Sequence, residues 1–306
     1  MKNEKIKIIW AINPFEAGNE IQLNIGHFLN KLSQKNFIEI IPLYISEFPV
    51  QYKRGTPDDY RNFVELKINS VLKNFPKLFF SKPVILTKEF ISLTDSIKRL
   101  DYYAKKINAN FIIVGTHGRK GFQRFFLGSF AETLLLNSKH SILTVGEKVK
   151  LKGSLNNIFY ATNLENSSQI ILKKVISFAK IFSTKITLFH ALRIFFQEMA
   201  PYGALEFGYA WTLSKNYISD QEEIEKRKIN KLATQIKKEN LKIKTIISQP
   251  STNTAETIVQ QATKNNASII ALATYSGKME TALLGSTARQ VVRSAPCPVL
   301  VLHLKN

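Results

Sequence analysis

An internal repeat is the feature that most constrains how this chain of 306 residues can fold. Three pairs of segments correspond: Ile6–Glu20 with Asn156–Gln169, Ile107–Thr116 with Asn265–Thr274, and Ser129–Val145 with Ser286–Leu302. The repeat length of about 150 residues is too long for a solenoid unit. The sequence therefore predicts two copies of one domain, covering residues 1–150 and 151–306.

Each copy alternates short apolar runs with longer segments in which apolar residues recur every three or four positions. This alternation predicts strands and helices in turn, hence βαβ units and a parallel sheet. The runs are apolar throughout, which is typical of strands covered by helices on both faces. In such sheets ligands bind beyond the carboxyl ends of the strands.

Composition excludes few partners. The net charge of +20 and the pI near 9.8 are compatible with binding to nucleic acid, to an anionic membrane surface or to a phosphorylated ligand. The lysines are spread evenly over both copies, which favours solvated helix faces and makes nucleic acid the weaker reading. One cysteine and five scattered histidines give no metal-ligand spacing. We expect a cytoplasmic protein with no membrane span and no metal or catalytic residues.

A glycine-rich loop follows the apolar run Phe111–Thr116 in the first copy. Gly115, Gly118 and Gly128 have the spacing G-x2-G-x9-G, with Ser129 directly after the last. A glycine-rich loop and the N-terminus of a helix both favour phosphate binding, and Arg119 adds positive charge. Ser129 with Glu132 also reads as a capping box, S-x-x-E, which needs no ligand. The spacing alone leaves both readings open.

The motif, the domain length and the order of segments together resemble the universal stress protein family in its tandem form. The resemblance covers nearly the whole chain and includes the ending Ser294–Leu302. It implies five-stranded parallel sheets in the order 3-2-1-4-5, ATP between the ends of the first and fourth strands, and pairing of the domains through their last strands. It also leaves room for a homodimer of whole chains.

The resemblance also implies which residues hold ATP, with or without Mg. In the first copy they are Ala11, Asn13, Ile45, Val114, Gly115, Gly118, Arg119, Gly128, Ser129 and Phe130. In the second copy they are Asn163, Gly285, Ser286 and Thr287.

The two copies depart from the family pattern differently. Both have asparagine, Asn13 and Asn163, where the family usually has aspartate. In the second copy Ala273 and Ser276 replace the two loop glycines. Because their side chains would crowd a close phosphate approach, we expect the first copy to hold the nucleotide and the second to bind it weakly or not at all.

These observations predict an ATP-binding regulatory or stress-response module rather than an efficient enzyme. No nucleophile motif and no pair of carboxylates stands in either loop, so any ATP hydrolysis is expected to be slow. The alternative is the same fold without nucleotide, acting as a protein-interaction scaffold. A further alternative is a different apolar ligand in the second copy, beside the aromatic-rich segment Arg193–Tyr217.

Overall fold

The computed structural model describes residues 5–15, 20–47, 56–88, 92–116, 127–151, 153–165, 167–192, 207–249, 253–274 and 284–304. The first half contains β1 (Ile6–Ala11), α1 (Glu20–Ser33), β2 (Ile38–Glu47), α2 (Pro57–Leu72), β3 (Val84–Lys88), α3 (Leu93–Lys106), β4 (Phe111–Thr116), α4 (Ser129–Asn137) and β5 (Ile142–Gly146). The second contains β6 (Asn157–Ala161), α5 (Ser168–Ile181), β7 (Lys185–Ala191), α6 (Phe207–Lys238), β8 (Ile243–Ser248), α7 (Thr254–Lys264), β9 (Ile269–Thr274), α8 (Ser286–Ser294) and β10 (Val299–His303).

All the described strands belong to a single ten-stranded sheet, with the order β3-β2-β1-β4-β5-β10-β9-β6-β7-β8. Within each half the neighbouring strands are parallel, and each half has the order 3-2-1-4-5 counted from its own first strand. The predicted α/β fold class is confirmed. The predicted domain boundary after residue 150 lies in the connection between β5 and β6.

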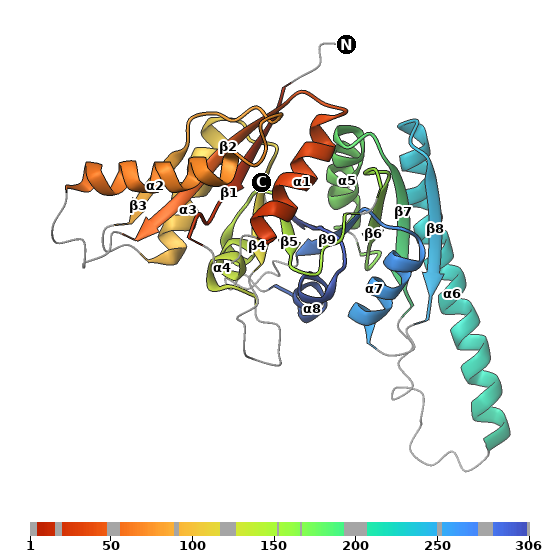
Figure 1. The fold of residues 1–306 in the computed structure, drawn as a ribbon. Coiled ribbons are helices and arrows are strands. Elements are labelled where there is room, and N and C mark those ends of the chain that lie inside the picture. The colour runs from red at the N-terminus through yellow and green to blue at the C-terminus, as the bar shows by residue number, and fades with distance from the viewer. Residues whose placement is uncertain are drawn as a thin grey trace.

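Helices cover both faces of the sheet (Figure 1). One core layer contains the buried side chains of α1, α2, α5 and α6, and the other contains those of α3, α4, α7 and α8. Strands β4 and β6 are buried along their whole length, which explains their mainly apolar sequences. In contrast, the outer strand β8 is half-buried or exposed and carries Lys244, as expected for a sheet edge.

Aromatic side chains join the two halves on the first of these faces. Phe111 of β4 lies 5.6 Å from Phe178 and 6.0 Å from Phe182, measured between ring centroids. Phe28 of α1 also contacts Phe182, at 6.1 Å. Because all four rings are buried, separating the halves would expose a large apolar surface to water.

The junction of the halves is the antiparallel pair β5–β10. Leu143 faces Leu300, and the flanking pairs are Thr144 with Val299 and Ile142 with Val301. This register is symmetric about the Leu143–Leu300 pair, so the copies meet as two related subunits would across a two-fold axis. Helices α4 and α8 come together beside this junction, where Arg289 pairs with Glu132 at 3.0 Å.

Glu132 and Arg289 occupy the same position in their copies, the fourth residue of α4 and of α8. Reversing either charge, by Glu132→Arg or Arg289→Glu, places like charges together and should lower the free energy of unfolding by about 1 kcal/mol. The swapped double variant restores an opposite pair and should recover most of that loss. Urea denaturation of all four proteins measures the coupling, and additive effects would contradict it.

His303, at the end of β10, is a buried titratable group in this junction region. Its Nδ1 lies 3.1 Å from the hydroxyl of Thr274, and its Nε2 is buried with no hydrogen-bond partner in the described structure. Burial lowers the pKa of His303 to about 4, and the nearby positive charge of Lys174 acts in the same direction. The folded protein therefore favours the neutral imidazole.

This lowered pKa predicts acid destabilisation. Below about pH 6.5 the unfolded chain protonates His303 while the folded chain does not, until the pH reaches about 4. Stability is thus fully present above pH 6.5 and should fall by about 3 kcal/mol as the pH drops to 4. Between pH 7.5 and 4.5, the free energy of unfolding measured by denaturation should fall less steeply for His303→Gln than for the unmodified protein. Parallel curves would show that His303 does not titrate in this way.

Candidate functional site

A pocket of about 340 Å³ lies at the carboxyl ends of β1, β2 and β4, next to the start of α4. Parallel sheets of this strand order bind ligands at this place. The strand order extends from β1 in both directions, with β2 on one side and β4 on the other, so the order reverses here. Its lining residues are Ala11, Ile12, Asn13, Gln22, Leu43, Tyr44, Ile45, Leu93, Val114, Gly115, Ser129 and Phe130.

Most of the residues predicted for the first copy meet in this pocket. Those that line it are Ala11, Asn13, Ile45, Val114, Gly115, Ser129 and Phe130. Gly128 directly precedes Ser129 as the N-cap of α4. Gly118 and Arg119 lie outside the described residues. None of the described lining residues is charged, so the pocket wall is apolar with a few polar groups.

The start of α4 carries no side-chain cap. Its N-cap is Gly128, which has extended backbone, and within the described part of the chain no side-chain cap hydrogen bond is formed there. The capping-box reading of Ser129 and Glu132 is therefore wrong, because Ser129 is already the first helical residue and Glu132 pairs with Arg289. In contrast, α2 and α3 begin with capping side chains, Thr56 and Ser92. The first residues of α4, Ser129 and Phe130, line the pocket, and among the described residues no side chain caps this end of the helix.

Asn13 is held by a local turn. Its Oδ1 accepts a hydrogen bond from the backbone N–H of Phe15 at 3.2 Å. The carbonyl oxygen can accept a second hydrogen bond, and the side-chain NH₂ is a further group that Asn13 can offer to a ligand. An aspartate could make the same turn but would bring an acceptor and a negative charge instead. The asparagine thus adds a donor and removes the negative charge at this point of the pocket.

Gly115 has a packing role that the sequence did not reveal. A Cβ atom at this position would lie 2.5 Å from Cγ2 of Ile21, a buried residue of α1. The glycine therefore lets α1 approach β4 closely. Beside it, the buried Gln22 accepts a hydrogen bond from the indole N–H of Trp10 at 3.0 Å. The sequence could have pointed to Gln22, because it is a polar residue on the apolar face of a predicted helix.

The second copy has a pocket of about 480 Å³ in the corresponding place. The predicted residues Asn163, Gly285, Ser286 and Thr287 line it. Ala273 also lines it, so the methyl group in place of a glycine leaves this pocket open; Ser276 lies outside the described residues. Helix α8 begins as α4 does, with Gly285 as N-cap and no capping side chain.

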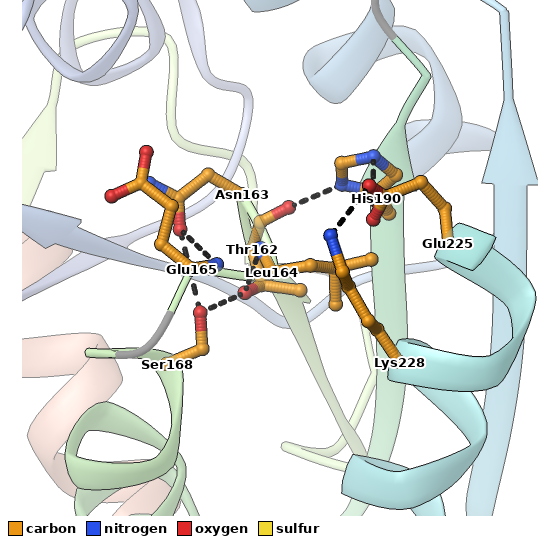
Figure 2. A network of polar contacts seen from close by, with 8 residues as sticks. All are labelled: Thr162, Asn163, Leu164, Glu165, Ser168, His190, Glu225 and Lys228. Carbon is orange, nitrogen blue, oxygen red and sulfur yellow. Dashed lines mark hydrogen bonds and ion pairs between the residues drawn. The ribbon is translucent and has the colours of Figure 1, made fainter. Parts of the chain in front are cut away.

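The second pocket differs from the first in that ionisable acidic and histidine residues line its described part (Figure 2). Its wall includes the carboxylates of Glu165 and Glu225 and the imidazole of His190. The sequence prediction missed His190 and Glu225, since Glu225 comes from the middle of a long helix with no motif around it. Among the described residues, no group of three or more His, Cys, Asp or Glu is arranged to hold a metal ion. In the same part of the chain, no helix has the length and apolar character needed to cross a membrane.

Comparison with known proteins decides the family. The sequence model of the universal stress protein family matches residues 84–146 and 155–303, which is most of the chain. The chain belongs to the universal stress protein family. Two matched segments agree with the tandem organisation.

Similar proteins carry the same family name. A curated relative, "Universal stress protein MJ0531" of Methanocaldococcus jannaschii, is 28% identical over 165 residues, which is 53% of this chain and 88% of the relative. A universal stress protein structure from Archaeoglobus fulgidus has a TM-score of 0.58 at 18% identity, covering 97% of this chain and 98% of its own. A putative universal stress protein from Pseudomonas aeruginosa has a TM-score of 0.56 at 14% identity, covering 99% and 94%.

The contact between Gly115 and Ile21 in this family member gives a test of packing alone. Gly115→Ala should lower the free energy of unfolding, measured without nucleotide, by about 1–3 kcal/mol, because the added methyl overlaps Ile21. Ile21→Ala removes Cγ2 and makes room, so in that background the Gly115→Ala change should cost much less. An equal cost in both backgrounds would refute the proposed contact.

Proposed function

We propose that this universal stress protein binds ATP, that the first copy holds it, and that the protein acts as a regulatory or stress-response module. The supporting observation is the convergence of the predicted residues on one pocket. Ala11, Ile45, Val114 and Ser129 come from four separate parts of the first half, yet all line it. Random placement of motif residues would scatter them over the domain.

The described residues fit the parts of a nucleotide. Ile45, Val114 and Phe130 supply an apolar wall for the adenine and ribose, and the NH₂ of Asn13 supplies a donor. The uncapped N-terminus of α4 supplies backbone N–H groups and a positive dipole end for phosphate oxygens. No carboxylate lies among the described lining residues, so an accompanying Mg²⁺ would be held mainly by the phosphates themselves.

A difference in charge between the two pockets supports the proposed division between the copies. The first pocket has an uncharged wall in its described part, whereas Glu165 and Glu225 line the second. Like charges at close range in a partly buried site disfavour a triphosphate. The proposed affinity for ATP is therefore much higher in the first copy.

The first pocket also suggests storage or sensing of ATP rather than rapid turnover. No carboxylate or histidine lies among its described lining residues to position or activate a water molecule. With only the described residues, hydrolysis there would depend on positioning and backbone donors, so we propose that it is slow. A long-lived ATP complex suits a module that reports nucleotide state to a partner.

Matched charge substitutions test this proposal. Ser129→Asp places a carboxylate at the start of α4, where it interacts favourably with the helix dipole but repels phosphate. We expect at least a tenfold loss of ATP affinity by calorimetric titration of the full chain, with an unchanged or slightly raised melting temperature.

Ser286→Asp is the control, because Ser286 has the same position at the start of α8. It should leave ATP affinity nearly unchanged. An equal loss in both variants would refute the division between the copies. Absence of ATP binding by the unmodified chain would favour the alternative of an interaction scaffold.

A further inference from the structure

A further cavity lies away from both strand-end pockets, between α1 and the connection that joins β5 to β6. Its volume is about 500 Å³. Its described lining comes from the segment 24–34 on one side and from Val149, Lys150 and Leu151 of the connection on the other. None of the residues predicted to hold nucleotide is among them, so the proposed function gives this cavity no role.

The helical period of α1 explains why its side of the cavity is polar. The core-facing side chains of this helix recur at three- and four-residue spacing, and they include Ile25, Leu29 and Leu32. A polar stripe recurs with the same spacing on the opposite side of the helix and continues into the turn that follows it. This stripe consists of Asn24, His27, Lys31 and Gln34, with Asn30 beside it.

The opposite wall is fixed by the backbone of the connection. Val149 is buried, and its N–H donates to the carbonyl oxygen of Gly146 at 3.2 Å. The N–H of Lys150 donates to the carbonyl oxygen of Pro296 at 3.1 Å. Farther along, a carbonyl oxygen of the connection accepts a hydrogen bond from the ammonium group of Lys31. The backbone that carries Lys150 is therefore held in place before any ligand binds.

The described lining offers hydrogen-bond donors and positive charge. Lys31 and Lys150 supply one ammonium group from each wall, and no carboxylate occurs among the described lining residues. The ammonium group of Lys31 has three hydrogens, of which the contact with the connection uses one. His27 carries an N–H in either tautomer, and its ring lies at 90° to that of Phe75, 5.7 Å away. The side-chain amides of the polar stripe add further donors.

These donors favour phosphate over carboxylate. No arginine occurs among the described lining residues, so the planar fork that matches a carboxylate is missing there. An ammonium group is a point charge that binds phosphate oxygens from several directions. Because the two ammonium groups come from different walls, a ligand with one phosphate group for each of them uses both.

We propose that the cavity between α1 and the connection binds a small ligand that carries two or more phosphate groups. Lys31 and Lys150 compensate its charge from the two walls, while His27 and the side-chain amides donate to the remaining oxygens. Since one wall belongs to the first half and the other to the segment that leads to the second, an occupied cavity holds the connection against α1. This site is separate from the proposed ATP site and does not depend on it.

Pyrophosphate and citrate test the class of ligand, because they carry similar charge at pH 7.5 and differ in the type of acidic group. Both are titrated into the full chain and followed by calorimetry. We expect pyrophosphate to bind at least tenfold more tightly than citrate. Equal affinities, or no binding of pyrophosphate at millimolar concentration, would overturn the proposal.

A matched pair of charge reversals assigns the binding to the cavity. Lys150 has an exposed side chain, so Lys150→Glu should leave thermal unfolding unchanged and weaken pyrophosphate binding at least tenfold. Lys105→Glu makes the same change in net charge on an exposed position of α3, which covers the other face of the sheet, and should leave the affinity nearly unchanged. Equal losses would show a diffuse attraction of anions to a basic protein and would refute the site.

Hydrogen exchange and the Ser129→Asp variant separate this site from the proposed ATP site. Pyrophosphate should slow amide exchange in residues 24–34 and 147–151, and it should do so equally in Ser129→Asp, whether or not the chain binds ATP. Protection confined to the start of α4, or loss of pyrophosphate binding in Ser129→Asp, would mean that the anion occupies the first pocket. Either result would overturn the assignment to the cavity.

Discussion

The antiparallel pairing of β5 with β10 is the interaction on which the rest of the structure depends. Each of these strands is the buried last strand of its half, and without the partner its backbone N–H and C=O groups would be left unpaired at an apolar sheet edge. Their pairing makes one sheet from two and allows α1 and α5 to share the ring cluster of Phe28, Phe111 and Phe182. The halves are therefore parts of one core rather than two units joined by a linker.

Because both copies are joined in one chain, their sequences can also differ from one another at equivalent positions. Glu132 and Arg289 illustrate this at the junction, where a two-fold arrangement of identical subunits would place like charges near each other. The two pockets illustrate it as well, because the described lining residues of the first are uncharged, whereas Glu165 and Glu225 line the second. The scaffold is common to both copies, and the chemistry is set by a few side chains at strand and helix ends.

The sequence predicted the fold well because its signals were local and repeated. Apolar strands, helix periodicity and the 150-residue repeat follow from burial, and the structure realises each of them. It predicted the first pocket through a motif, and it failed where contacts depend on tertiary position. The capping-box reading of Ser129 is wrong, because Glu132 pairs with Arg289 of the other half. The meeting of His190 with Glu225 could not be foreseen, because it depends on where α6 crosses the end of β7.

Gly115 shows why a motif residue can have two causes. The comparison of copies favoured bound nucleotide as the reason for this glycine, since Ala273 replaces it in the second copy. The structure supplies a packing cause, because α1 lies so close to β4 that Ile21 would meet a Cβ atom. In the second copy Ile171 lies eight residues after Asn163, as Ile21 lies eight after Asn13, and there the side chain lines the pocket beside Ala273. The argument for phosphate in the first copy therefore rests less on Gly115 than on the uncapped start of α4. There Ser129 is exposed, and no capping side chain is found among the described residues.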